Sequence, residues 1–218
     1  MSIVKPPEQE PAFLQPFLSF CHRRRYPAKT DIVHPGDDAD TLFYLIDGSV
    51  AIIIEDDEGK EIILTYLNKG EFIGEMGLFT PQKPSRSVLV RTRSSCMLAE
   101  ISYSRLEQLF ETDLKPHVRA LLYAMGAQLT QRLLHTSRKV GHLAFLDVTG
   151  RIAGTLLELC KQPDAMTHPD GMQIRITRQE IGRIVGCSRE MAGRVLKNLE
   201  EQGLIDVKGK TIVVYGTR

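Results

Sequence analysis

The 218-residue sequence lacks the cysteine arrangements of metal-binding and disulfide-rich proteins. Its cysteines, Cys21, Cys96, Cys160 and Cys187, form no CxxC pair and no Cys/His cluster. Neither a zinc site nor a disulfide framework is therefore expected, and no other metal site is predicted. Scattered single cysteines are typical of a reducing compartment, so we expect a cytoplasmic protein.

Long apolar segments are also missing. No run of about 18 apolar residues, the length that spans a bilayer, occurs in the sequence. The first residues, MSIVKPPEQEP, contain no apolar core of a signal peptide. Both observations predict a soluble protein without a membrane partner.

Catalytic motifs are absent as well. The six histidines form no HExxH or other metal-ligand spacing, and neither a GxSxG frame nor a Walker loop occurs. We therefore expect a binding protein and not an enzyme. The apolar content of 42% is sufficient for one large or two small cores.

Charge is unevenly distributed, although the net charge is only +1. The segment from Met172 to Arg218 holds nine Lys and Arg residues against five Asp and Glu residues, which makes it +4. The remainder of the chain is therefore −3. A basic C-terminal end favours a nucleic-acid partner.

Short β-strands are predicted from about residue 28 to residue 101. Apolar residues there alternate with polar ones or form short runs such as TLFYLI and SVAIII, and DDEG at 56–59 is typical of a hairpin turn. Many short strands with a turn about every ten residues predict a jelly roll or barrel. We expect this β domain to occupy residues 1–113.

A long helix is predicted to follow, from about Leu114 to Val140. Apolar residues recur there at steps of three and four, as in a coiled-coil seam. We expect this segment, within residues 114–146, to pair with a second copy in a homodimer; the alternative is that it packs on its own domain. The seam consists of Val118, Leu122, Met125, Leu129, Leu133 and Thr136.

A small domain is predicted over residues 147–218. Asp147 can cap a helix that runs to about Cys160. Residues 161–171 are rich in turn formers and are expected to form an exposed loop. MQIRI predicts a strand, and DVKGKTIVVYGTR predicts a terminal hairpin that turns at KGK.

Residues 177–203, TRQEIGRIVGCSREMAGRVLKNLEEQG, contain two helical patterns separated only by GCS. Thr177 and Glu180 have the spacing of a capping box. Gly186 can adopt the left-handed conformation that ends the first helix, and Ser188 can cap the second. Gly182 is expected to allow close approach of the neighbouring helix. This abrupt corner is typical of a helix-turn-helix.

The second helix has an apolar face, predicted as Met191, Val195 and Leu199, and a charged face. A structural hairpin with a solvated charged face is the alternative, but the caps, glycines and basic residues together favour DNA binding. Arg can donate to guanine and Glu can accept from cytosine in the major groove. The predicted base readers are Arg189, Glu190 and Arg194, with Lys197 on the same face, and the predicted phosphate contacts are Thr177, Arg178, Gln179 and Ser188.

The stretches ITRQEIGRIVGCSRE, DAMTHPDGMQI, LAFLDVTGR and GKTIVVYGTR resemble the bacterial cyclic AMP receptor protein family, also called catabolite activator proteins, and its virulence factor regulator type in particular. The resemblance extends from about residue 17 to the C-terminus. It implies an α+β protein with an N-terminal β-roll (jelly-roll) cyclic-nucleotide-binding domain, a long dimerisation helix and a C-terminal winged helix-turn-helix domain. It also implies cyclic AMP as an allosteric ligand and RNA polymerase as a partner.

The segment FIGEMGLFTPQKPSRSVLVR resembles the phosphate-binding cassette of this family. By resemblance, Arg86 and Ser87 bind the cyclic phosphate, Glu75 accepts from the ribose 2′-hydroxyl, and Gly74 lets the backbone approach. On the residues alone, an ordinary Glu–Arg pair beside a turn is the alternative. The base is expected near Leu64, Thr65, Thr136 and the partner subunit's Ser137. Thr65 replaces a serine common in the family, and the loop TPQKPS differs from the usual pattern.

The resemblance further implies two contact surfaces for RNA polymerase. One contains Thr167 and His168, and the other contains His22, Arg24 and Arg105, where Arg24 replaces a common histidine. Ordinary surface polarity is the alternative explanation for these residues.

The expected function is cyclic AMP-dependent binding to palindromic operators. Ligand binding would alter the pairing of the long helices and rotate the C-terminal domains about a hinge near residues 145–147. A relative that responds to cyclic di-GMP is the alternative. An iron–sulfur sensor would need an N-terminal cysteine cluster, where only Cys21 occurs.

Overall fold

The computed structural model describes residues 10–80 and 85–217. It divides into two compact units, each described by itself. The N-terminal unit comprises Met1–Val50 and Leu67–Arg132, and the C-terminal unit comprises Ala51–Tyr66 and Leu133–Arg218.

The division crosses two strands and one helix. It cuts β4 (Ser49–Glu55) after Val50, β5 (Glu61–Asn68) after Tyr66 and α3 (Val118–Phe145) after Arg132. As a result, most of the hairpin formed by β4 and β5 belongs to the C-terminal unit, although it lies early in the sequence.

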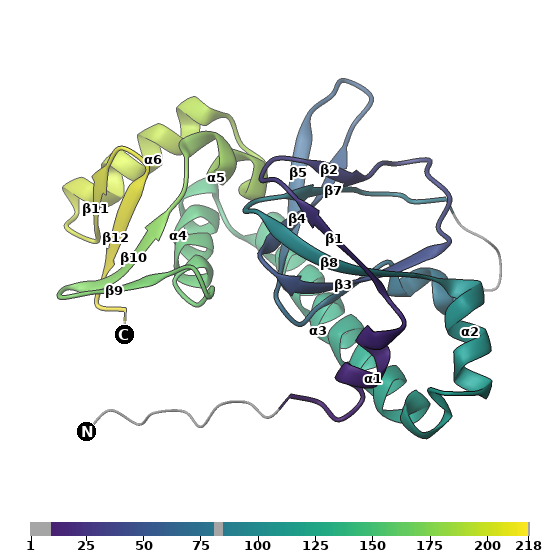
Figure 1. Cartoon of the computed structure of the whole chain (residues 1–218). Coiled ribbons are helices and arrows are strands. Elements are labelled where there is room, and N and C mark those ends of the chain that lie inside the picture. The colour runs from purple at the N-terminus through teal and green to yellow at the C-terminus, as the bar shows by residue number, and fades with distance from the viewer. Residues whose placement is uncertain (1–9, 81–84, 218) are drawn as a thin grey trace. The chain divides into compact units, whose positions relative to one another are not determined.

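Eight strands in the first half of the chain form two four-stranded sheets (Figure 1), which confirms the predicted β-rich domain. The sheet orders are β1-β8-β3-β6 and β2-β7-β4-β5. The remaining strands are β1 (His22–Tyr26), β2 (Asp31–Val33), β3 (Thr41–Asp47), β6 (Phe72–Ile73), β7 (Leu89–Thr92) and β8 (Cys96–Ser102).

The first strand begins earlier than the predicted residue 28. Strand β1 reads HRRRY, lies at the edge of its sheet and exposes four of its five residues. An edge strand that buries so few residues has no alternation of apolar and polar residues. The hydrophobic pattern of the sequence therefore did not predict β1.

The core of the N-terminal unit is centred on three aromatic rings. Phe17, Tyr44 and Phe72 meet edge to face, with centroids 4.9 Å apart for Tyr44 and Phe72. Such rings bury a large area and add favourable edge-to-face contacts. The helical elements of this half are α1 (Leu14–Ser19), the 3₁₀ turns η1 (Glu75–Leu78) and η2 (Lys115–His117), α2 (Tyr103–Glu111) and the first part of α3.

Helix α3 differs from its prediction at both ends. It begins at Val118, because Leu114–His117 carry a 3₁₀ turn with Pro116, and it continues five residues beyond Val140. Met125 was predicted on the dimer seam, but it is fully buried with Leu121 in the core of the N-terminal unit. The prediction of Met125 in the seam is therefore wrong. Helical spacing identifies an apolar face, but it does not show whether that face packs within its own domain or against a second subunit.

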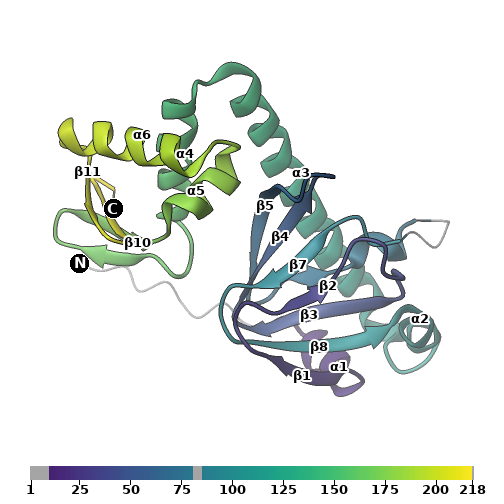
Figure 2. The same ribbon diagram turned by 90° about the horizontal axis from the view of Figure 1, so that it is seen from above.

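The second half of the chain carries a winged helix-turn-helix (Figure 1). Its strands form one sheet of order β11-β12-β10-β9. Helices α4, α5 and α6 pack against one another and share one core with this sheet (Figure 2). The elements are α4 (Val148–Leu159), β9 (Met166–His168), β10 (Gly171–Arg175), α5 (Arg178–Val185), α6 (Arg189–Glu201), β11 (Ile205–Lys208) and β12 (Thr211–Tyr215).

The helix ends in this domain form as predicted. Asp147 accepts from the Gly150 amide at 2.8 Å, and Thr177 and Ser188 accept from the amides three residues ahead at 3.1 Å. Gly186 is left-handed with φ 71°. Each contact lies within a few residues, so the local sequence is enough to specify it.

Three details of this domain differ from expectation. Residues 161–171 are not only loop, because β9 pairs with β10 there. Met191 is 39% exposed, and the buried stripe of α6 consists of Ala192, Val195, Leu196 and Leu199. A Cβ on Gly182 would lie 2.6 Å from the Cys187 carbonyl oxygen, so this glycine admits the turn and not the neighbouring helix.

No helix among the described residues is long and apolar enough to cross a membrane.

Candidate nucleotide-binding site and DNA interface

The nucleotide cassette, as we call Gly74, Glu75, Arg86 and Ser87, is assembled in the N-terminal unit. Gly74 has φ 88°, which favours glycine. A Cβ there would lie 2.5 Å from Nη1 of Arg86 and 2.8 Å from the Thr41 carbonyl oxygen. The structure therefore brings Gly74 and Arg86 together, although twelve positions separate them. The differing loop at 80–85 lies largely outside the described residues.

Arg86 is held by neutral groups. Its guanidinium donates to the Thr41 carbonyl and to the Tyr103 hydroxyl, and its own backbone amide donates to the Asp37 carbonyl at 2.8 Å. No carboxylate among the described residues forms an ion pair with Arg86. Its positive charge is therefore uncompensated by a bonded partner and suits an anion.

Tyr103 is a cassette residue that the sequence did not reveal. Its hydroxyl donates to the Gly74 carbonyl, and its ring lies beside Gly77, where a Cβ would come within 2.5 Å of the hydroxyl. Burial raises the pKa of Tyr103, and Arg86 opposes this in part, so the phenol stays protonated and can donate. Tyr103 is the first residue of α2 and lies 29 positions after Gly74. No local sequence pattern connects two positions so far apart.

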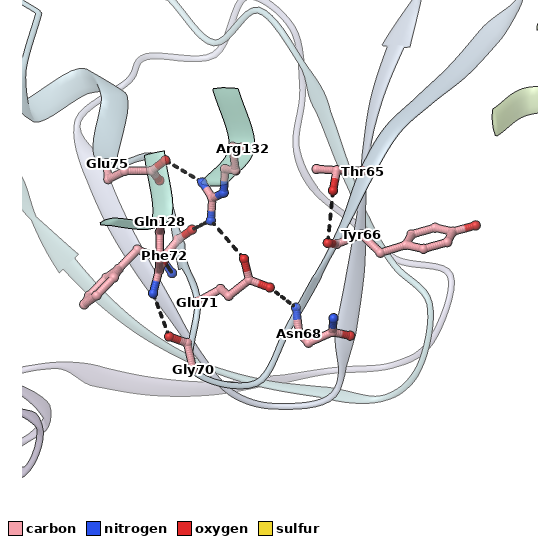
Figure 3. Close-up of polar contacts among 9 residues, drawn as sticks. All are labelled: Thr65, Tyr66, Asn68, Gly70, Glu71, Phe72, Glu75, Gln128 and Arg132. Carbon is pink, nitrogen blue, oxygen red and sulfur yellow. Dashed lines mark hydrogen bonds and ion pairs between the residues drawn. The ribbon is translucent and has the colours of Figure 1, made fainter. Parts of the chain in front are cut away.

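Glu75 lies at the first position of η1 and is only 1% exposed. One carboxylate oxygen, Oε1, pairs with Nη1 of Arg132 on α3 (Figure 3). The other, Oε2, has no hydrogen-bond partner among the described residues. A buried acceptor without a hydrogen-bond donor lowers the stability of the folded state. The chemistry of Oε2 therefore fits a ligand hydroxyl that would donate to it.

Two polar residues of α3, one turn apart, contact the segment that precedes the cassette (Figure 3). Gln128 accepts from the Phe72 amide at 2.9 Å and donates to the Gly70 carbonyl at 3.0 Å. Arg132 donates to the Phe72 carbonyl and lies 3.6 Å from Glu71. Their i, i+4 spacing on a helix was the one sequence signal that could have identified them.

The other predicted ligand residues lie in the C-terminal unit. Leu64 and Thr65 are half-buried on β5, and Thr65 Oγ1 donates to the Tyr66 carbonyl at 3.3 Å. Thr136 and Ser137 are exposed on α3. The eight predicted ligand residues therefore form two sets, four in each unit.

A small cavity of about 80 Å³ lies within the C-terminal unit, beside Leu64 and Thr65. Lys139 enters it from α3 and donates to the carbonyls of Ile63 and Leu64. Burial lowers the pKa of Lys139 to about 8, and nearby Glu158 opposes this shift. This amine thus ties α3 to strand β5.

The predicted DNA interface lies on α5 and α6. Seven of its eight residues are exposed, and only Thr177 is half-buried. Arg178 lies beside α6, since a Cβ on Gly193 would be 3.4 Å from its Cδ. The pKa of Glu190 is lowered, first by a hydrogen bond from the backbone amide of Glu190 itself and then by one from Ser188. Glu190 is therefore a charged acceptor. The exposed residues are Arg178, Gln179, Ser188, Arg189, Glu190, Arg194 and Lys197.

Two family models match the two halves of the sequence. The cyclic nucleotide-binding domain matches residues 23–113, and the Crp-like helix-turn-helix domain matches residues 150–215. The cAMP-activated global transcriptional regulator Vfr of Pseudomonas aeruginosa is 61% identical over 207 residues, which cover 94% of each chain. This chain belongs to the CRP family of transcription regulators. It is therefore a DNA-binding regulator and not an enzyme.

Other CRP-family proteins agree on the fold but differ in their signal. The CRP-like protein Clp of Xanthomonas campestris is 58% identical over 205 residues, covering 94% of this chain and 89% of Clp. The structure of the c-di-GMP-responsive global regulator CLP of the same species has a TM-score of 0.89 at 56% identity, covering 95% of this chain and all of that one. The CRP-family regulator TTHA1359 of Thermus thermophilus shares the fold at 23% identity and TM-score 0.72, with 88% and 93% covered. A cyclic nucleotide is thus supported as the ligand class.

The surfaces predicted for polymerase lie in both units of this CRP-family chain. Thr167 is exposed on β9, and half-buried His168 lies 3.7 Å from Asp170. His22 pairs in register with Glu100, close to the end of β8, and Arg105 lies in the first turn of α2, which follows β8 directly. Arg24 stacks over Tyr26 at 5.1 Å.

Proposed function

We propose that this CRP-family protein is activated by cyclic AMP and binds palindromic operators in the cytoplasm as a homodimer. One observation carries the proposal: among the described residues, buried Glu75 Oε2 has no donor and Arg86 of the same cassette has no anionic partner. A ribose 2′-hydroxyl and a cyclic phosphate supply these two groups from one molecule.

The remaining ligand contacts follow from the two sets of residues. Arg86 and Ser87 bind the cyclic phosphate, Gly74 admits the sugar, and Glu75 accepts from the ribose. The base lies against Leu64, Thr65, Thr136 and the partner subunit's Ser137. Tyr103, Gln128 and Arg132 hold the cassette in position and do not contact the phosphate.

The homodimer is supported by the outer face of α3. Leu133 is 67% exposed and Val140 is 60% exposed. Together with half-buried Leu122 and Leu129 and exposed Thr136, they lie at steps of seven, four, three and four residues. Burial of such a seam against a second copy is favourable. Sedimentation of the purified protein should give a dimer, and a monomer at micromolar concentration contradicts this part of the proposal.

Ligand binding would act on DNA binding through this seam. Helices α3 and α4 are separated only by Leu146 and Asp147. These residues form the proposed hinge about which the DNA-binding domain rotates. Two recognition helices then enter successive major grooves; the cyclic AMP receptor protein is itself among the proteins from which this docking geometry was described. The nucleotide can shift the equilibrium only by its differential affinity for the two states.

Cyclic di-GMP is the second candidate signal, because the similar regulator CLP responds to it. Calorimetric titration with both nucleotides distinguishes the candidates, followed by fluorescence anisotropy with an operator duplex with and without each nucleotide. We expect cyclic AMP to bind and to raise operator affinity. A response to cyclic di-GMP alone selects the second candidate, and operator affinity independent of both removes nucleotide control.

Contact with RNA polymerase is the last part of the proposal. It rests on the exposed Thr167 and on the places of His22, paired with Glu100 of β8, and Arg105, in the first turn of α2 after β8. In a transcription assay with purified polymerase, Thr167→Ala should lower activation while operator affinity stays constant. Full activation by this variant excludes contact through β9.

A further inference from the structure

The strand that carries Leu64 and Thr65 is fastened to the helix-turn-helix domain within one chain. We propose that the hairpin β4–β5 couples nucleotide binding to the first helix of the helix-turn-helix, α5, inside a single protomer. This inference rests on the proposed function, and it adds a route that does not pass through the dimer seam. All the contacts concerned lie within the C-terminal unit.

The first fastening joins Tyr66 to Glu180. The Tyr66 hydroxyl donates to Glu180 Oε1 at 2.6 Å, and its ring packs against the core of the C-terminal unit. A hydrogen bond to a carboxylate is about twice as strong as one between neutral groups. The backbone amide of Glu180 donates to the N-cap Thr177 at 3.1 Å, so the bond from Tyr66 acts on the N-terminal turn of α5.

The second fastening is an ion pair between Glu61 and Arg183, with Nη1 and Oε2 2.9 Å apart. The Glu61 side chain is 13% exposed, which reduces screening by water and salt. Arg183 lies three residues after Glu180, so both fastenings meet one face of α5. Helix α5 is therefore held by β5 at two points one turn apart.

The third fastening is Lys139, which donates from α3 to the carbonyls of Ile63 and Leu64. Strand β5 is thus held at residues 61, 63–64 and 66. The proposed base contacts, Leu64 and Thr65, lie between these points. A strand rises about 3.3 Å per residue, so Leu64 lies within about 10 Å of both Glu61 and Tyr66 along the strand.

The consequence is a contiguous chain of contacts from the nucleotide to α5. A ligand that moves or stiffens Leu64 and Thr65 changes the free energy of the Tyr66–Glu180 and Glu61–Arg183 contacts. Coupling of this kind requires a bonded network with two arrangements, and it is reciprocal. The hairpin residues are positioning residues in this scheme, because they act on α5 and are not among the predicted DNA contacts.

Charge reversal tests the route. Operator affinity should be measured by anisotropy with and without cyclic AMP for wild type, Glu61→Arg, Arg183→Glu and the double exchange. Each single variant should reduce the ratio of the two affinities by about fivefold or more, the lower range of allosteric coupling. The double exchange should recover most of the ratio. Lys161→Glu, an exposed charge reversal in the same unit, is the control. Wild-type ratios in both single variants overturn the proposal.

A second measurement separates this inference from the proposed function. Hydrogen exchange of the α5 amides, without nucleotide, should accelerate in Glu61→Arg and in Tyr66→Phe, two changes outside α5 itself. If cyclic AMP has no effect on wild type but exchange responds, the proposed signal fails and the fastening of α5 stands. If exchange in α5 is unchanged in both variants, the hairpin does not control α5 and the inference is wrong.

Discussion

The nucleotide cassette and the helix-turn-helix are built in opposite ways. Both N-caps of the helix-turn-helix are closed by an amide three positions away, as when Ser188 accepts from the Met191 amide. The cassette residues Gly74, Glu75 and Arg86 are instead held, together with Thr41, Tyr103 and Arg132, by contacts between separate segments of the chain.

The two sites also differ in how completely they are satisfied. The cassette leaves two buried polar atoms without partners among the described residues, Glu75 Oε2 and Arg132 Nε. The predicted DNA-binding side chains of α6 are instead in water. A site for a small ligand can keep its polar groups buried and incomplete, whereas a site for a duplex has to present its groups outward.

The largest expected effect is on the cassette. Arg86→Leu removes the charged partner of the cyclic phosphate and should weaken nucleotide binding by about 100-fold or more, or about 3 kcal/mol. Calorimetry measures this loss, and circular dichroism should show an unchanged fold. The matched control is Arg23→Leu, on the exposed edge strand β1. Equal nucleotide affinity of wild type and Arg86→Leu would place the phosphate elsewhere and break the comparison.

The next effect concerns the outward-facing site. Arg189→Ala should weaken operator binding by about 1–3 kcal/mol and relax base preference at one position of each half-site. Lys197→Ala provides the contrast, because loss of a phosphate contact weakens all sequences alike and lowers the salt slope by about one. Anisotropy with single-base operator variants measures both. Uniform weakening by Arg189→Ala would make this residue a phosphate contact.

A smaller effect tests one of the long-range contacts of the C-terminal unit, the hydrogen bonds of Lys139 to strand β5. Lys139 has its pKa lowered to about 8 in the folded protein, against 10.5 ordinarily. Between these values the unfolded chain binds more protons than the native one, so stability rises with pH. Allowing for partial solvent exposure, the rise amounts to about 1–2 kcal/mol.

Urea unfolding of wild type and Lys139→Met between pH 7 and pH 10.5 measures this term as the difference between the two proteins. The difference in unfolding free energy should move in favour of wild type above pH 8. A constant difference would show that Lys139 is not confined between α3 and β5.

The smallest effect concerns a local cap. Ser188→Ala removes the acceptor for the Met191 amide and should lower the unfolding free energy by about 1 kcal/mol. Ser95→Ala is the control, because this exposed serine makes no side-chain hydrogen bond among the described residues. Urea unfolding followed by circular dichroism compares the two. A loss equal to that of the control would mean that packing alone holds the start of α6.

Prediction from sequence succeeded where interactions are short-range. The turns at 56–59 and 209, the cap residues Asp147 and Thr177, and the left-handed Gly186 were all predicted from a few neighbouring residues. It failed for Met125 and Met191, because helical spacing identifies an apolar face but not the surface that covers it. It also missed the strand β1, whose charged residues lie at a sheet edge.

By itself, the sequence determined the order of the elements, the helix-turn-helix corner and the residue types of the cassette, since caps, turns and periodicity act within about one helical turn. Only the tertiary structure decided which groups complete each site. Glu75 meets Arg132 across 57 positions, and Tyr66 meets Glu180 across 114. Such pairs depend on how sheets and helices pack, and packing is set by the whole buried core rather than by any local pattern.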